Sequence, residues 1–366
     1  MGTLIKNVNV FDGKKFIGVK DIAIEGNRIV SELTSDSEVI DGTGKTLLPG
    51  FWDCHVHVYD RPDFLKKSRR YGNTTILDMG CRIHDTIDKM RSAGIVNILS
   101  PYFIAVAPTS SAIESMQYPE LCRMKTPEDG VKFVHRMIEW GADYIKIILE
   151  EESGVGRTAG SDFPIEIGKA IVDEAHKFDL KVIAHAVTVS SWRKGIAFGV
   201  DILTHMPMSE EIPDDVVEAI VRQGITLTPT ITMMDAIATN IHKKVPQAPV
   251  SKKIAEENLK KLIKAGAEIL VSTDANEDDP CPPASVEYGL GLLNEMENIK
   301  ECGMSNTEVL MCATSKPSEY FGQPERGIIT PGKIADLVLV NGNPEANLAD
   351  IYNIDRVLVG GQQFKY

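Results

Sequence analysis

The chain has 366 residues, of which 39 are basic and 52 acidic, so its formal net charge at pH 7 is −13. Its composition, 43% hydrophobic and 25% charged, is that of an ordinary globular protein and excludes disordered, collagen-like and low-complexity classes. The acidic balance argues against a nucleic-acid partner. The sequence has no apolar run of about 18 residues that would predict a membrane span, and no signal-peptide core. The six cysteines form no CxxC pair, so we expect reduced thiols and a cytoplasmic protein.

Both ends of the chain have the pattern of short strands. Residues 1–48 alternate between apolar and polar side chains, and this pattern predicts a run of short antiparallel strands with turns at Asp12-Gly13, Gly26-Asn27 and Asp41-Gly42. Residues 322–366 repeat the pattern. Each end is too small to form a stable sheet alone. We therefore expect residues 1–48 and 322–366 to pair into one small β-sandwich domain, with residues 49–321 inserted between them.

The middle of the chain alternates strands and helices. Helical periodicity fills the gaps between apolar, strand-like runs near residues 51, 75, 98, 144, 182, 202, 227 and 269. Eight strand–helix units over about 270 residues predict an α/β fold of the distorted (β/α)8 barrel type. A doubly wound open sheet is the alternative, and the lack of a Gly-rich turn after the first strand disfavours it.

Polar residues with metal-binding chemistry end several of these strands. In the segment FWDCHVH (residues 51–57), Asp53, His55 and His57 share one face of a strand. Taken alone, the pair His55 and His57 is better explained as two ordinary surface or core histidines than as metal ligands. However, four of the eight histidines and one aspartate end predicted barrel strands at one rim, where barrel active sites lie. Together they predict a metal site made of His55, His57, His185, His205 and Asp274.

Lys146 lies inside a predicted barrel strand, where a buried ammonium is costly. One interpretation is a lysine paired with a carboxylate such as Asp274. The other is that burial and nearby cations favour the neutral amine, which adds carbon dioxide to give an anionic carbamate that can bridge two metals. The strand alone does not decide between them.

The sequence resembles the amidohydrolase superfamily and, within it, the imidazolonepropionase-like and prolidase-like branch. The resemblance covers nearly the whole chain in the family's order. It rests on PGFWDCHVH (49–57), GADYIK (141–146), His185, Thr204-His205, STD (272–274), ATSKP (313–317) and GIITPGKIADLVLV (327–340).

The resemblance implies a role for each of these residues. His55, His57 and Asp274 would hold the more buried of two divalent ions, for which zinc is the usual occupant. His185 and His205 would hold the more exposed ion, and a carboxylated Lys146 would bridge the two. Asp274 and His205 are the expected catalytic residues, with Asp274 moving a proton from the attacking hydroxide to the leaving amine. Asp53 either orients a ligand or has a structural role.

One departure from the family pattern bears on the reaction. Deaminases of the superfamily place a glutamate three residues after the histidine of the fifth strand, where this chain has Thr188. Together with Lys146, this favours hydrolysis of an amide. The alternatives are a mononuclear deaminase or cyclic amidohydrolase, and a non-catalytic scaffold, which would have no need of the complete ligand set.

The substrate is less well defined by the sequence. Acidic loops at 150–152, 210–211 and 277–279 suggest a cationic substrate group, although solvated loops are the simpler interpretation. Arg157 or Arg82 could bind a substrate carboxylate, and Tyr102 could donate to a carbonyl oxygen. We therefore expect a small-molecule substrate, a dipeptide of the Xaa-Pro type or an N-acyl amino acid. The sequence leaves open whether copies of the chain form a homo-oligomer.

Overall fold

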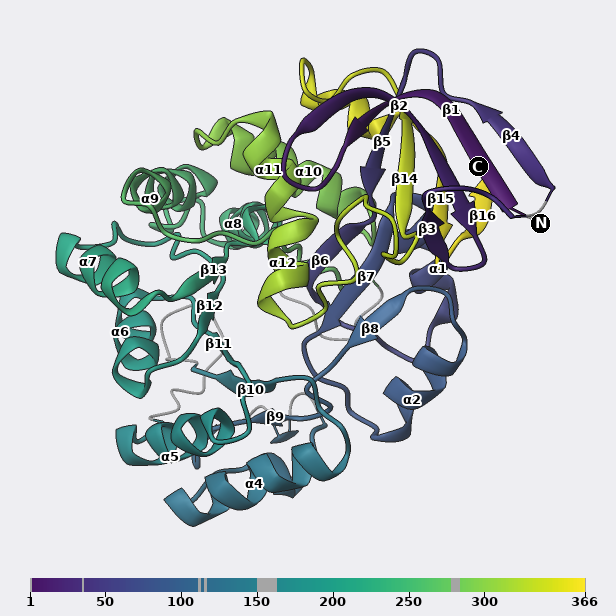
Figure 1. Ribbon diagram of the computed structural model, residues 1–366. Coiled ribbons are helices and arrows are strands. Elements are labelled where there is room, and N and C mark those ends of the chain that lie inside the picture. Colours follow the sequence, from purple (N-terminus) through teal and green to yellow (C-terminus); the bar gives the residue numbers. More distant parts are fainter. Residues whose placement is uncertain are drawn as a thin grey trace.

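The computed structural model describes residues 2–34, 36–110, 113–114, 117–149, 163–277 and 284–365. Figure 1 shows a β-rich body that contains both chain ends, beside a second body in which helices surround parallel strands. The prediction of an α/β barrel with an added β body is confirmed by this arrangement.

The β-rich body is one sheet built from both ends of the chain. Its eight strands are β1 (Gly2–Phe11), β2 (Phe16–Glu25), β3 (Arg28–Val30), β4 (Ser37–Asp41), β5 (Lys45–Pro49), β14 (Leu337–Asn341), β15 (Ile354–Val359) and β16 (Gln362–Lys365). The order is β16-β15-β14-β5-β1-β2-β3, with β4 paired to β1. An antiparallel bridge between Arg28 and Ile334 brings β3 to the segment that precedes β14, so the sheet folds over its own apolar core. The domain boundaries at residues 48/49 and 321/322 stay a prediction.

The expectation of purely antiparallel strands at the N-terminus is wrong. β4 and β5 follow one another along the same edge of β1, and both pair with it in parallel. The residue at the predicted turn, Gly42, donates its N–H to Lys6 O at 2.7 Å, so pairing with β1 continues through the junction. The chain bends there and continues in the same direction. β1 has ten residues, and its backbone groups along this edge pair first with β4 and then with β5.

The second body is a closed barrel of parallel strands. The strands are β6 (Phe51–Val56), β7 (Asn73–Asp78), β8 (Asn97–Leu99), β9 (Ile104–Ala105), β10 (Ile145–Ile148), β11 (Val182–His185), β12 (Ile202–Thr204) and β13 (Thr226–Thr228). They pair as β6-β7-β8 and β13-β12-β11-β10-β9. Residues 269–275 act as the eighth barrel strand, because Ile269 bridges Leu227 and Ala275 bridges Val56, both in parallel.

The barrel is distorted at its third strand. β8 and β9 occupy that position together, and the chain bends between them at Tyr102, whose φ is 59°. A positive φ is rare for a residue with a side chain and interrupts a strand. The third strand therefore pairs with its two neighbours through different segments: β8 with β7, and β9 with β10.

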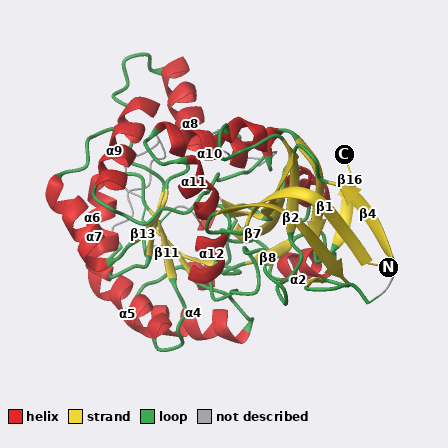
Figure 2. Ribbon diagram, turned by 45° about the horizontal axis from the view of Figure 1, so that its top comes forward, coloured by secondary structure: helices red, strands yellow, loops and turns green. Residues whose placement is uncertain are grey.

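Helices form the outer layer around the barrel strands (Figure 2). They are α1 (Pro62–Arg70), α2 (Asp85–Ser92), α4 (Pro127–Glu139), α5 (Ile165–His176), α6 (Val189–Phe198), α7 (Asp214–Gln223), α8 (Ile231–Lys244), α9 (Lys252–Lys264), α10 (Leu290–Glu301), α11 (Asn306–Cys312) and α12 (Ser315–Tyr320), with short 3-10 turns η1 (Glu120–Cys122) and η2 (Leu348–Tyr352). Local sequence sets several starts. At α4, for example, the Thr126 side chain accepts from Asp129 N in a capping box. Among the described residues, none of the helices has the length and apolar content needed to cross a bilayer.

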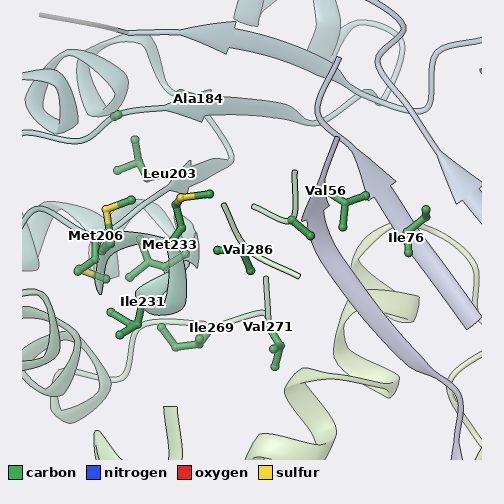
Figure 3. Close-up of a cluster of buried hydrophobic side chains, with 14 of the residues drawn as sticks. Val56, Ile76, Ala184, Leu203, Met206, Ile231, Met233, Ile269, Val271 and Val286 are labelled. Atoms are coloured by element: carbon green, nitrogen blue, oxygen red, sulfur yellow. The ribbon is translucent and has the colours of Figure 1, made fainter. Parts of the chain in front are cut away.

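A single large apolar cluster joins the barrel strands to the surrounding helices. Figure 3 shows part of it, including Val56 of β6, Ile76 of β7, Leu203 of β12, and Ile231 and Met233 of α8. Close packing of this kind fixes the strand ends, and with them the side chains that these ends carry.

Candidate metal centre

Four histidines and one aspartate meet at the carboxyl ends of the barrel strands. His55 is in β6, His57 follows it, His185 ends β11, and His205 follows β12. Ring centroids lie 4.8 Å apart for His55 and His205, 4.5 Å for His185 and His205, and 5.7 Å for His55 and His57. The structure therefore brings all four predicted histidine ligands together.

Asp274 lies against these rings from the eighth strand. Its Oδ1 is 3.3 Å from His55 Nε2 and 3.1 Å from His57 Nε2. His55, His205 and Asp274 each present a ligand atom within 4.8 Å of the other two. The division of the ligands between two ions, which the resemblance implies, stays a prediction.

Threonine hydroxyls hold the outer ring nitrogens of two histidines. His55 Nδ1 is 2.7 Å from Thr204 Oγ1, and His205 Nδ1 is 2.8 Å from Thr230 Oγ1. The Thr204 hydroxyl donates its own proton to Thr228 O at 3.3 Å, so it accepts from His55 Nδ1–H. The Nε2 atom of His55 then carries a lone pair, and it faces a carboxylate oxygen. Two acceptors this close require a proton or a cation between them.

The charge states of the trio suit a divalent cation. Burial lowers the pKa of His55 to about 3, and the nearby Lys146 charge acts in the same direction. Burial also lowers the pKa of His205 well below its usual value. Burial alone would raise the pKa of Asp274, but the adjacent histidines hold it well below its usual value. Neutral imidazoles and an ionised carboxylate are the donors that zinc and similar ions bind, so the residues fit a metal.

Three residues around this site have left-handed backbone conformations. The φ values are 75° for His205, 61° for Asp274 and 49° for Thr230. Each costs of order 1–3 kcal/mol, and such strain concentrates at functional sites. Backbone bonds hold the strained ends in place, since Asp274 N donates to His55 O at 2.8 Å and His205 N to Thr228 O at 3.0 Å.

Lys146 lies in β10 and is only 2% exposed. Met79 Sδ, 3.3 Å from its Nζ, is the one acceptor that this amine reaches within the described residues. Burial lowers the pKa of Lys146 to about 7, although the charges of Asp274 and Asp78 oppose the shift. A thioether is a weak acceptor. Asp274 acts on this amine through its charge, and the ion pairs among the described residues do not include one between Lys146 and Asp274.

Two buried aspartates support the ends of the ligand-bearing strands. Asp53 accepts from His55 N at 3.2 Å and from Thr273 N and Oγ1 at 3.1 and 2.7 Å. It therefore ties β6 to the residue before Asp274, which is the structural role considered for it; orientation of a ligand side chain stays a prediction. Asp78 accepts from Val58 N, next to His57, at 2.9 Å and from Ser100 Oγ at 2.8 Å. The sequence reasoning missed Asp78, whose signal was an acidic residue at the end of a predicted strand.

The predicted substrate-binding residues lie in different places. The Tyr102 hydroxyl donates to Asp88 Oδ1 at 2.6 Å and accepts from Arg91 at 3.2 Å, both on α2. Its role in substrate binding stays a prediction. Arg82 lines a pocket of about 130 Å³ that also contains His57. Arg157 lies outside the described residues.

The acidic residues expected at the mouth lie partly within the described residues. Residues 150–152 and 278–279 lie outside the described residues. Glu277 forms an ion pair with Lys67 at 2.7 Å, and Glu210 accepts from Val189 N at 3.3 Å. These two carboxylates therefore have partners within the protein.

Comparison with known proteins identifies the family of this chain and solved structures with a similar fold. Residues 46–364 match the model of the amidohydrolase family. The chain is 23% identical over 372 residues to an adenine deaminase from Clostridium perfringens, with 95% of this chain and 57% of that protein covered. It is 25% identical over 363 residues to an enamidase from Eubacterium barkeri, with 93% and 86% covered. The structure of a Xaa-Pro dipeptidase with methionine in its active site matches with a TM-score of 0.83 and 21% identity, covering 100% of each chain. The chain thus spans just over half the length of the adenine deaminase.

Proposed function

Because the chain belongs to the amidohydrolase family, we propose that it is a metal-dependent hydrolase that cleaves a carbon–nitrogen bond of a small-molecule substrate. The observation that carries this proposal is the trio of His55, His205 and Asp274, whose ligand atoms lie within 4.8 Å of one another. The trio occupies the carboxyl ends of the barrel strands, where the active sites of such barrels lie.

The proposal includes two divalent ions, most simply zinc, for which His57 and His185 would complete the ligand set and a carboxylated Lys146 would supply further oxygen ligands. A pKa of about 7 makes the Lys146 amine largely neutral at slightly alkaline pH. The neutral Nζ attacks the carbon of carbon dioxide, the N–C bond forms, and one proton leaves to solvent. The resulting carbamate would carry one negative charge and offer two oxygen ligands, so it would be able to bind both ions.

When bound, the ions polarise the scissile carbonyl and make a water molecule acidic enough to attack it. Asp274 is the proposed proton carrier, because its carboxylate lies among the histidines of the centre and is ionised, as a base must be before it accepts a proton. Its Oδ1 contacts both His55 and His57, so Oδ2 is the atom assigned to take the proton and return it to the leaving nitrogen. The proposed catalytic role of His205 is to hold its Nε2 at the centre while Thr230 fixes its ring.

The pocket beside His57 supports a particular substrate class. Its volume of about 130 Å³ suits a small ring or side chain, and its walls combine apolar groups with one guanidinium, one imidazole and the carboxylate of Asp60. It is lined by His57, Val58, Tyr59, Asp60, Gly80, Cys81, Arg82, Ile83, Thr86 and Tyr118. A guanidinium binds a carboxylate through two parallel hydrogen bonds. We assign the pocket to the leaving amino acid of a Xaa-Pro dipeptide or an N-acyl amino acid, with Arg82 on its carboxylate. Arg157 is kept as the rival carboxylate ligand.

Deamination is the second candidate, favoured by the likeness to adenine deaminase. The position that carries a glutamate in deaminases of the superfamily is Thr188 here. Its hydroxyl accepts from Ser191 N at 3.1 Å in the capping box of α6, so it serves the helix start. A capping threonine cannot replace a carboxylate in proton transfer, which favours amide hydrolysis.

The test is an assay of metal-loaded protein against Xaa-Pro dipeptides, N-acetyl amino acids and adenine, with amino-acid and ammonia release measured separately. We expect release of a free amino acid, lost by at least 100-fold in Asp274→Asn and retained in Asp85→Asn, whose carboxylate is exposed on α2. Ammonia release from adenine without amide cleavage would replace the hydrolase proposal with the deaminase one. Activity that survives Asp274→Asn would refute the assigned proton carrier.

A further inference from the structure

Glu295, on α10, is a carboxylate that the metal site does not use and whose side chain is fully buried at 0% exposure. Burying a carboxylate is costly unless strong hydrogen bonds satisfy it. Three of its hydrogen bonds come from one place, the start of α8, and the Asn298 side chain on its own helix also donates to it. Oε1 accepts from Ile231 N at 2.7 Å, and Oε2 accepts from Thr232 N and Thr232 Oγ1, both at 2.7 Å.

The first N–H groups of a helix have no partner inside the helix, and a threonine at the N-cap position usually accepts from one of them. At α8 the N-cap residue is Thr230, but within the described chain its side chain makes no capping bond. Its backbone is left-handed, with φ 49° and ψ 45°. Glu295 supplies the cap from another helix, where its negative charge also suits the helix N-terminus.

Because the hydroxyl of Thr230 does not cap α8, it is available to contact the candidate metal centre. Thr230 Oγ1 lies 2.8 Å from His205 Nδ1, which leaves Nε2 as the atom of His205 that can bind a metal. The first turn of α8 is fixed on its apolar side as well, since Ile231 and Met233 belong to the buried cluster (Figure 3). Polar and apolar contacts thus hold the left-handed residue from both sides.

We propose that Glu295 is a positioning residue of the metal centre: it caps α8 from α10, and thereby keeps Thr230 in the conformation that holds the His205 ring. This inference rests on the proposed metal-dependent function. It assigns to Glu295 an effect through two other residues, with no contact to metal or substrate.

A double-mutant cycle on zinc affinity tests the proposal. The variants are Glu295→Gln, Thr230→Val and the double variant, and zinc affinity is measured by competition with a chromophoric chelator. Loss of a hydrogen bond behind a ligating histidine costs roughly 10–100-fold in affinity, so we expect that loss in each single variant. Both substitutions disrupt the same hydrogen bond, between Thr230 and His205. The double variant should therefore bind zinc at most about twofold more weakly than the weaker-binding single variant.

Controls separate positioning from general stability. Glu174→Gln removes another nearly buried carboxylate, whose partners Lys177 and His135 lie 2.6 and 2.9 Å away on the outer helices, and zinc affinity should be unchanged. If Glu295→Gln does not fold, Thr232→Val removes one donor to the same carboxylate and should give a smaller loss in the same direction. Additive losses in the cycle, or a Glu295→Gln variant with wild-type affinity, would overturn the proposal.

The effect of Glu295→Gln on the His205 ring can also be measured in metal-free protein. In metal-free protein, the nitrogen chemical shifts of the His205 ring should show a proton on Nδ1 in the wild type, and less of this tautomer in Glu295→Gln. A wild type that binds no zinc would refute the proposed metal centre, while this readout would still test Glu295. An unchanged His205 tautomer in Glu295→Gln would refute the positioning role alone.

Discussion

At the scale of single residues, the centre depends on ring orientation as much as on the identity of the ligands. His55 and His205 each use Nδ1 for a threonine of a neighbouring strand or loop, so both can turn Nε2 toward Asp274. Partners of this kind fix the tautomer and raise the basicity of the metal-binding nitrogen.

Thr204→Val tests this contribution for His55. Valine has nearly the same shape but no acceptor, so the Nδ1–H of His55 would be buried without its partner. We expect zinc affinity to fall by roughly 10–100-fold, as measured by chelator competition, and Thr204→Ser to stay within about threefold of the wild type. Equal losses in both variants would show that packing, and not the hydroxyl, holds the ring.

Lys146 gives a pH-dependent prediction. Its pKa is lowered from 10.5 to about 7 in the folded chain, chiefly by burial. Between these values the unfolded chain binds more protons at this residue, so the stability that the lysine contributes rises with pH. In metal-free, carbon-dioxide-free buffer, the free energy of unfolding of the wild type should rise relative to Lys146→Met from pH 7 to 9.5, by up to about 1.4 kcal/mol per pH unit. A difference that stays flat across this range in denaturant titrations would contradict a depressed pKa.

The ligands could be predicted at this scale, but not their supports. His185, His205 and Asp274 stand at the ends of apolar runs, and parallel strands bring such ends to one rim. Thr204, Thr230 and Asp78 act through contacts between residues 22 to 149 positions apart, the longest being that between His55 and Thr204. No local pattern encodes a contact at that separation.

At the scale of secondary-structure elements, strand and helix positions followed from periodicity, whereas strand pairing did not. The alternation of residues 1–48 predicts strands correctly. It does not predict that β4 and β5 lie one after the other along the same edge of β1 and both pair with it in parallel. Similarly, the left-handed Tyr102 divides the third barrel strand, and contacts such as its bond to Asp88, which no strand pattern predicts, stabilise that break.

The junction between β5 and β6 is tightly packed and can be tested. A Cβ atom at Gly50 would lie 2.1 Å from Thr74 Oγ1 and 2.3 Å from Thr74 Cγ2, and Thr74 is buried on β7. Gly50→Ala should therefore lower the free energy of unfolding by about 1–3 kcal/mol. Thr74→Gly removes the clashing side chain, so the double variant should lose less than the sum of the two single losses. Simple additivity in denaturant unfolding would mean that the clash is relieved elsewhere.

At the scale of the whole molecule, the β-rich body joins the two ends of the chain. β5, just before the barrel, pairs with β14, just after it, and Leu47 lies opposite Leu339 in that pairing. Both side chains are fully buried in the same apolar core. The first and last segments are therefore expected to fold together.

Leu47→Ala tests the contribution of this core. Removing a fully buried leucine side chain should cost about 2–5 kcal/mol in the free energy of unfolding. The matched control is Val39→Ala on β4, where the side chain is 59% exposed and the loss should stay below about 0.5 kcal/mol. A small effect at Leu47 would show that the β-rich body contributes little to the stability of the chain.

The measurement that tests the central claim most directly is the metal content per chain, by elemental analysis, of wild-type protein and Lys146→Ala produced with zinc and bicarbonate. A binuclear centre bridged by a carboxylated lysine predicts about two ions in the wild type and a clear fall in the variant. About one ion in both proteins would make Lys146 structural and the centre mononuclear. A wild type that holds no metal would contradict the proposed metal-dependent function itself.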